Sequence, residues 1–257
     1  MTNSILGSSC NPLPHIYVYC LVYYLVMKTK NSKITSFIVA MMFLTGVACA
    51  QDKETRDLRN FDEIRVSEGI EVIAQKGSEN KIEIEVDYIE LDDVITEVRG
   101  GRLHIHLERG RYRRKWIKAY LTYTDEPTYI TANTAAEVVF KDKITTRSLD
   151  INTSTSGFVE LEVEVDRLDL SASTSGRIDI KGKTDDIRAG ASTGGTIYAY
   201  EVEAVEGSAK ANTGADVRIR VEDFLRASAG TGGSVKYKGR PKTDVRSNTG
   251  GSVRRSN

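Results

Sequence analysis

A short motif of small residues recurs along the second half of this chain, and its spacing limits what the chain can fold into. The motif reads STSG at Ser154 and Ser173 and STGG at Ser192, and close variants follow. Its threonines are separated by 21, 19, 19, 20, 18 and 18 residues; they are Thr134, Thr155, Thr174, Thr193, Thr213, Thr231 and Thr249. A period near 19 residues is typical of stacked units that bury their apolar sides against each other.

Within each repeat, apolar and polar residues alternate with a period of two. The apolar and small residues of one repeat share one parity, namely Leu168, Leu170, Ala172, Thr174, Gly176, Ile178 and Ile180. Such alternation indicates β-strands. Nineteen residues are too few for a strand, a crossover helix and a return strand, and no Asn-Gly hairpin interrupts the repeat. We therefore predict an all-β fold, a single-stranded parallel β-helix with about 19 residues in each rung.

The inward parity also includes the motif itself, so we expect its small residues to line a tight inner corner of the coil. Thr174 and Gly176 fall on this parity, while Ser173 and Ser175 fall on the outer one. Gly176, Gly195 and Gly233 suit a bend with positive φ or a close approach of two backbones. The threonine hydroxyls, if they point inward, would donate hydrogen bonds from rung to rung.

The N-terminal part of the domain differs from the repeats. Residues 58–130 keep the strand alternation but lose the period, whereas residues 131–257 hold the repeat rungs. A stacked coil exposes an unpaired sheet edge at its end. We therefore expect a single domain over residues 51–257, in which residues 58–130 form an N-terminal cap of β-strands.

The first 50 residues carry a targeting signal. Residues 27–50 combine a basic start, an apolar run from Ile34 to Ala48 and an Ala-Cys-Ala site, the pattern of a secretory signal peptide cleaved after Ala50. A lipoprotein anchor at Cys49 is the alternative, although Gly46 stands where an aliphatic residue is usual. Residues 1–26 are interpreted as an upstream extension from a start codon assigned too early, because their apolar stretch is too short to span a bilayer.

Export restricts the partners that the chain can have. The chain has 36 basic and 36 acidic side chains, and three of the lysines lie in the first 50 residues, so the remainder carries 33 minus 36, or −3. All three cysteines also lie there, which excludes disulfides and thiolate metal sites from the mature domain. We expect no nucleic-acid partner, no cofactor and no transmembrane span in the mature chain.

Several motifs together resemble a known family. They are NFDEI at Asn60, the Gly69-Ile70 pair, VDYIELDDV at Val86, GGRL at Gly100 and the Thr-Gly repeats. From Leu58 to Val253 the chain resembles the secreted "putative auto-transporter adhesin, head GIN" family of Bacteroidetes, although Glu71 replaces the Asn of a literal Gly-Ile-Asn. The resemblance implies a right-handed β-helix and an envelope or extracellular location, and it implies no particular catalytic or binding residues.

The outward parity after each motif forms two columns of side chains that change from acidic through aromatic to basic. The columns are Glu160, Asp179, Tyr198, Arg218, Lys236 and Arg254, and Glu162, Lys181, Tyr200, Arg220 and Lys238. Aromatic rings beside cations suit an acidic sugar. We therefore take Tyr198, Tyr200, Arg218, Arg220, Lys236 and Lys238 as candidate ligand-binding residues for an anionic glycan. The simpler interpretation is a solvated sheet face with mixed charge.

Two further clusters are weaker candidates. A basic patch with interleaved aromatic side chains consists of Arg109, Arg111, Arg113, Arg114, Lys115, Trp116 and Lys118, and it is either an exposed turn or a site for an anionic glycan or lipid headgroup. His104, His106 and Glu108 share one face of a strand and could hold zinc. We interpret that face as solvated and expect no metal.

These observations favour a binding protein over an enzyme. The mature chain has no cysteine, its histidines share one strand, and the best carboxylate pair, Glu160 with Asp179, has no long loop around it to form a cleft. Three functions follow: an exported adhesin for a glycan or another surface polymer, a structural envelope protein that pairs through the edge of the coil, and, least favoured, a polysaccharide-processing enzyme.

Overall fold

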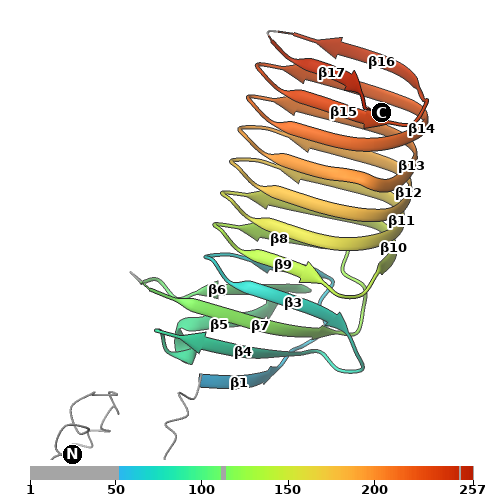
Figure 1. The fold of residues 1–257 in the computed structure, drawn as a ribbon. Helices are drawn as coiled ribbons and strands as arrows, with labels where there is room; N and C mark the ends of the chain where they lie inside the picture. The colour runs from blue at the N-terminus through green and yellow to red at the C-terminus, as the bar shows by residue number, and fades with distance from the viewer. Residues whose placement is uncertain (1–51, 111–113, 249, 257) are drawn as a thin grey trace, which may run out of the picture. The chain divides into compact units, whose positions relative to one another are not determined.

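The computed structural model describes residues 52–110, 114–248 and 250–256, which fold as a coil of β-strands (Figure 1). The coil is a β-solenoid of about seven turns with roughly 19 residues in each turn, as predicted. The predicted signal peptide and the upstream extension lie outside the described residues. The strands are β1 (Asp52–Asp57), β2 (Glu63–Val66), β3 (Glu71–Lys76), β4 (Lys81–Asp87), β5 (Val94–Arg99), β6 (Arg102–Leu107), β7 (Trp116–Tyr123), β8 (Tyr129–Asn133), β9 (Glu137–Phe140), β10 (Ile144–Ser154), β11 (Phe158–Ala172), β12 (Arg177–Ala191), β13 (Thr196–Asn212), β14 (Asp216–Gly230), β15 (Ser234–Lys238), β16 (Lys242–Ser247) and β17 (Ser252–Arg255).

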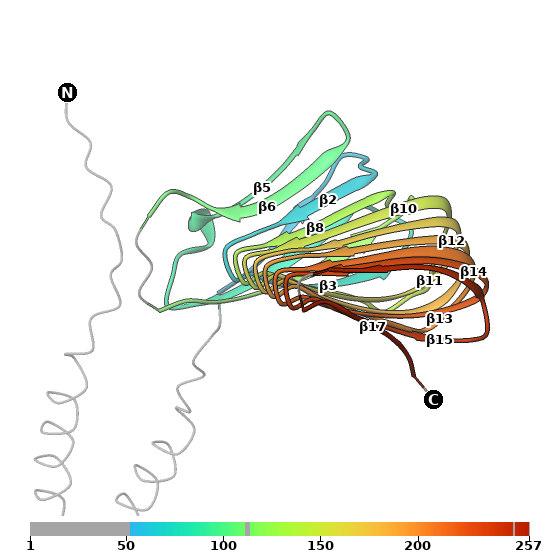
Figure 2. The same cartoon turned by 90° about the horizontal axis from the view of Figure 1, so that it is seen from above.

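The long strands contribute to both flat sides of the coil, because each one bends between two straight segments (Figure 2). In β12, residues 177–180 follow the motif and build the first face, and residues 187–191 precede the next motif and build the second face. Inward residues of both faces, such as Ile178 and Ile187, are fully buried in one continuous core. Each buried aliphatic side chain of this kind contributes roughly 1.5–3 kcal/mol, so the stacked core holds the two faces together.

The repeated motif forms a tight turn between the two faces. In the turn from Ser173 to Gly176, the Gly176 N–H donates to the Ser173 carbonyl at 2.8 Å, and φ is 47° at Thr174 and 62° at Ser175. Positive φ at both central residues is the signature of a type I′ turn. The Ser175 N–H also donates to the Thr193 carbonyl of the next rung at 3.1 Å, so the turns stack through their backbones.

The prediction that the motif threonines line the inner corner is therefore wrong. Each of these side chains within the described residues is exposed, namely Thr134, Thr155, Thr174, Thr193, Thr213 and Thr231. The two central residues of the turn occupy the left-handed region and point away from the coil. Because two buried positions, Ala172 and Gly176, lie an even number of residues apart across the turn, the parity continues through it and places Thr174 on the wrong side.

The glycine at the fourth motif position is favoured by a close approach of two backbones, although Ala136 and Ala215 occupy this place in two other turns. A Cβ on Gly195 would lie 2.2 Å from the carbonyl oxygen of Ala172, and one on Gly176 would lie 2.7 Å from that of Thr153. Neither distance is possible without a shift of the chain. The expected close approach at Gly176, Gly195 and Gly233 is confirmed, whereas the positive φ falls on the two preceding residues.

The N-terminal segment contains two rungs that are stacked out of chain order. β2 and β3 pair in parallel with β8 and β9, and the Gly69 N–H donates to the Thr134 carbonyl at 2.9 Å, as in the motif turns. β6 and β7 pair in parallel with the other side of β2 and β3. Antiparallel strands then end the coil, since β5 pairs with β6, β4 with β7 and β1 with β4. Residues 58–130 thus include two complete rungs besides the strands that cover the edge.

The C-terminal end of the described chain differs, because no antiparallel strand covers it there. β16 pairs with β14 and β17 with β15, both in parallel, and no later described strand pairs with either of them. In the described part of the chain, no helix has the length and apolar character needed to cross a membrane.

Candidate functional site

The first outward column lies on the first face in the predicted register. Glu160 pairs with Asp179, Asp179 with Tyr198, Tyr198 with Arg218, Arg218 with Lys236, and Lys236 with Arg254. Neighbouring members are therefore separated by one interstrand spacing, about 4.8 Å. We call the six candidate residues Tyr198, Tyr200, Arg218, Arg220, Lys236 and Lys238 the platform.

The second predicted column is interrupted next to Tyr200. The register between β12 and β13 shifts by one residue after Asp179, so Lys181 pairs with Glu201 instead of Tyr200. Farther along, Arg220 pairs with Lys238 as predicted, and the Lys238 ammonium lies 4.9 Å from the centroid of the Tyr200 ring. Tyr200 therefore belongs with the basic end of the platform, and its link to Lys181 was a wrong prediction.

The Tyr198 ring lies between two arginines from neighbouring rungs. The guanidinium carbons of Arg177 and Arg218 are 4.7 Å and 4.5 Å from the ring centroid. Asp216 accepts from Arg218 Nη2 at 2.8 Å, and Asp179 accepts from Arg177 Nε at 2.8 Å. Both guanidinium groups thus contact the ring, so its faces are less open to a sugar than the sequence suggested. Arg177 was not among the candidate residues, although it occupies the outward parity.

A hollow of about 440 Å³ lies beside the platform on the same face. Tyr198 and Tyr200 line it together with four carboxylates and two lysines, namely Glu160, Glu162, Asp179, Glu201, Lys141 and Lys181. The Tyr200 hydroxyl is buried and has no hydrogen-bond partner among the described residues. The hollow thus presents many acceptors, an arrangement that suits hydroxyl-rich ligands better than anions.

The basic patch is partly engaged in structural contacts. The Lys115 ammonium donates to the Glu68 carbonyl, and Lys118 pairs with Glu71 at 2.6 Å. Arg109, Arg114 and Trp116 are exposed, while Arg111 and Arg113 lie outside the described residues.

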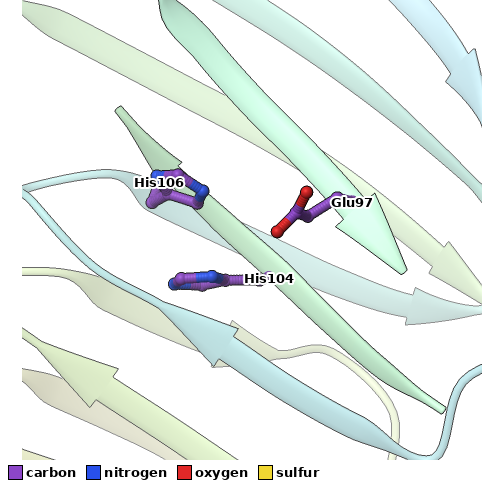
Figure 3. A group of neighbouring side chains, drawn as sticks. All are labelled: Glu97, His104 and His106. Carbon is purple, nitrogen blue, oxygen red and sulfur yellow. The ribbon is translucent and has the colours of Figure 1, made fainter. Parts of the chain in front are cut away.

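The two histidines of β6 are joined by an acid that the sequence analysis did not select (Figure 3). Glu97, His104 and His106 offer ligand atoms that all lie within 4.8 Å of one another, and all three side chains are half-buried. Glu108, the acid predicted for this trio, lies beyond the end of β6. Burial, together with His106 and Arg65, lowers the pKa of His104 below its ordinary value.

Solved structures with this fold come from species of Parabacteroides and Bacteroides. A putative adhesin from Parabacteroides merdae is 20% identical, with a TM-score of 0.68 over 82% of this chain and 98% of that one. A putative adhesin from Bacteroides fragilis is 16% identical, with a TM-score of 0.69 over 81% and 97%. A putative lipid binding protein from Parabacteroides distasonis is 20% identical, with a TM-score of 0.65 over 82% and 98%. At these identities the likeness concerns the fold alone.

The family match rests on the sequence of the solenoid. No curated protein matches the chain. A family model described as "Putative auto-transporter adhesin, head GIN domain" matches residues 60–241, which include both out-of-order rungs, most of the motif turns and the whole platform. The chain therefore belongs to the putative auto-transporter adhesin, head GIN domain family.

Proposed function

We propose that this protein is exported and acts, without catalysis, as an adhesin in the cell envelope or outside the cell, where its platform binds an anionic glycan. Family membership supports the adhesin class, and the signal-peptide pattern of residues 27–50 supports export with cleavage after Ala50. The class of ligand has to be inferred from the charges and shape of this protein's own surface.

The observation that carries the proposal is the stack of cations on the first face. Arg218, Lys236 and Arg254 follow one another on adjacent rungs in register, and Arg220 pairs with Lys238 beside them. Three nearby carboxylates, Asp216, Glu203 and Glu222, pair with members of this stack, so its five cations exceed them by two. A rigid strand scaffold holds these charges in position before the ligand arrives, which lowers the entropic cost of binding.

The hollow next to the cations supports a carbohydrate rather than a simple anion. Its carboxylates can accept hydrogen bonds from sugar hydroxyls. In this arrangement the uncharged part of a glycan lies in the hollow and its acidic groups lie along Arg218 and Lys236.

The carboxylates of the hollow fit a binding role. Glu160 and Asp179 are register partners, as a glycosidase pair would need to be, but Asp179 is held by Arg177 through its side chain. Because the Arg177 guanidinium already pairs with Asp179, this carboxylate fits a binding surface better than a glycosidase pair.

The test is a set of acidic and neutral glycans offered to the full chain and to a Tyr198→Ala, Tyr200→Ala, Arg218→Ala variant. The parent is expected to bind acidic glycans, and the variant is expected to lose at least about tenfold in affinity, because two rings and one guanidinium leave the site. Equal binding by the two proteins, with matching thermal midpoints, would refute the proposal that the platform binds the glycan.

The uncovered C-terminal edge favours a second function, an interaction with an envelope protein. β16 and β17 end the described coil, and Val245 on β16 is 45% exposed. Such an edge can accept a strand from a partner. Cell fractionation followed by a comparison of glycan binding with partners captured by cross-linking separates the two functions.

A further inference from the structure

The hairpin of β5 and β6 brings two histidines and one glutamate onto the same surface. The connecting glycines, Gly100 and Gly101, have φ of 58° and 80°, so the turn reverses the chain tightly. The resulting register pairs Glu97 directly with His104, and His106 follows two residues later on the same face of β6. Leu103, Ile105 and Leu107 point into the core, which leaves the histidines on the outside.

The three side chains form a donor set that borderline divalent metals prefer. Their ligand atoms lie within 4.8 Å of one another, and the two imidazole centroids are 4.2 Å apart with the rings tilted by 32°. A tetrahedral ion with bonds of about 2.0–2.1 Å holds its ligand atoms about 3.4 Å apart. Side-chain rotations that move each ligand atom by about 1 Å would therefore be enough to close the site, with no movement of the strands.

The orientation of His106 also suits metal binding. His106 Nδ1 lies 2.9 Å from the carbonyl oxygen of Leu107, so the tautomer that donates this hydrogen bond carries its proton on Nδ1. Nε2 is then left with a free lone pair. A backbone carbonyl that fixes the ring in this way is the usual outer contact of a metal-bound histidine.

The neighbouring charges leave the site accessible to a cation. Glu97 pairs with Arg99 at 2.8 Å, but the Arg99 side chain is 81% exposed, and an exposed pair of this kind is weak. Arg65 on β2 pairs in register with His104 and opposes a cation, whereas Glu68 lies near and favours one.

We propose that Glu97, His104 and His106 form a zinc site with three protein ligands and a water molecule in the fourth position. The ion would join β5, the edge strand of the hairpin, to β6, and so fasten the end of the coil. This inference is independent of the platform, which lies on rungs farther along the solenoid.

The test compares zinc binding by the full chain, without a histidine tag, and by His104→Gln, His106→Gln and Glu97→Gln variants. Each protein is stripped of metal and titrated with ZnCl₂ in a calorimeter, and Co²⁺ absorption reports the ligand type. His15 and the three cysteines are present in every protein, so the difference between parent and variant reports this cluster. Glu83→Gln, an acid on β4 paired with Lys53, is the matched control.

We expect the parent and Glu83→Gln to bind one more zinc ion than the ligand variants do. The thermal midpoint of these two proteins should rise when zinc is added. Each ligand variant should bind zinc at least about 100-fold more weakly, since even the loss of an outer contact costs 10–100-fold. Equal zinc affinity in parent and ligand variants, or a Co²⁺ spectrum of thiolate ligation alone in the parent, would overturn the proposal.

Discussion

The motif turns and the platform belong to the same rungs, yet one repeats its residues and the other changes them. At the turns, small residues recur from Ser154 to Gly233 because every turn makes the same backbone contacts with its neighbour. On the first face, the register that starts at Glu160 passes through Tyr198 and ends at Arg254. Repetition therefore marks a geometric need that all rungs share, and variation marks a surface that is free to fit a ligand.

The largest expected effect comes from breaking a motif turn. Gly195→Val places a branched side chain where the Cβ itself would lie 2.2 Å from the Ala172 carbonyl oxygen. Ala215 occupies the equivalent place in the next rung, so one methyl can be accommodated by a local shift, but two further methyls cannot. We expect a loss of at least about 3 kcal/mol in the free energy of unfolding, measured by denaturant titration.

The matched control for this change is Gly190→Ala on the second face. Its added Cβ would meet nothing closer than 3.9 Å, and its φ is not positive. We expect a change within about 0.5 kcal/mol. Similar losses for the two variants would show that the turn has no special need for glycine.

A smaller effect is expected from removing the ring that holds two arginines. Tyr198→Leu removes contacts of 4.7 Å and 4.5 Å with Arg177 and Arg218, each worth about 0.5–1 kcal/mol at an exposed site. We expect binding of an acidic glycan to weaken about fivefold. Tyr198→Phe keeps the ring and should bind like the parent, so an equal loss in both variants would assign the effect to the hydroxyl.

The smallest effect concerns the exposed threonines of the motif. Thr174 has φ of 47°, a conformation that β-branched residues adopt at a cost and Asn tolerates. We therefore expect Thr174→Asn to raise the free energy of unfolding by up to about 1 kcal/mol, which would appear as a slightly higher thermal midpoint. Thr174→Val removes the hydroxyl and keeps the β-branched shape, so it should leave the free energy of unfolding almost unchanged. A loss above about 2 kcal/mol would indicate that the hydroxyl is buried and hydrogen-bonded after all.

Much of the fold could be predicted because strand parity and repeat length are local properties. Ile178 and Ile187 were placed inside correctly, and the register from Glu160 to Arg254 followed from the spacing. The motif threonines were misplaced because the inward parity is the same before and after the two-residue turn. The two central residues of the turn have positive φ and do not follow that parity, so their side chains point outward. The order of the N-terminal rungs depends on contacts between distant segments, such as β3 with β9, which no local pattern encodes.

In the candidate sites, too, some features follow from the local sequence pattern and others depend on contacts between rungs. The register shift beside Tyr200 had a signal in the sequence, since the rung from Thr193 to Thr213 is one residue longer than the rung before it. The pairing of Glu97 with His104 could also have been found, because both lie symmetrically about the Gly100-Gly101 turn. The position of Arg177 and Arg218 on the Tyr198 ring depends on side-chain packing between rungs and could not.

Our proposal places glycan binding in the platform and not in the total charge or in the repeated motif. It is tested most directly by titrating polygalacturonate against two charge-matched variants. One carries Arg218→Ala, Lys236→Ala and Lys238→Ala on the first face, and the other carries Arg188→Ala, Lys210→Ala and Arg226→Ala on exposed positions of the second face. We expect at least about a tenfold loss of affinity for the first variant and less than about a twofold loss for the second. Equal losses in the two variants would contradict it.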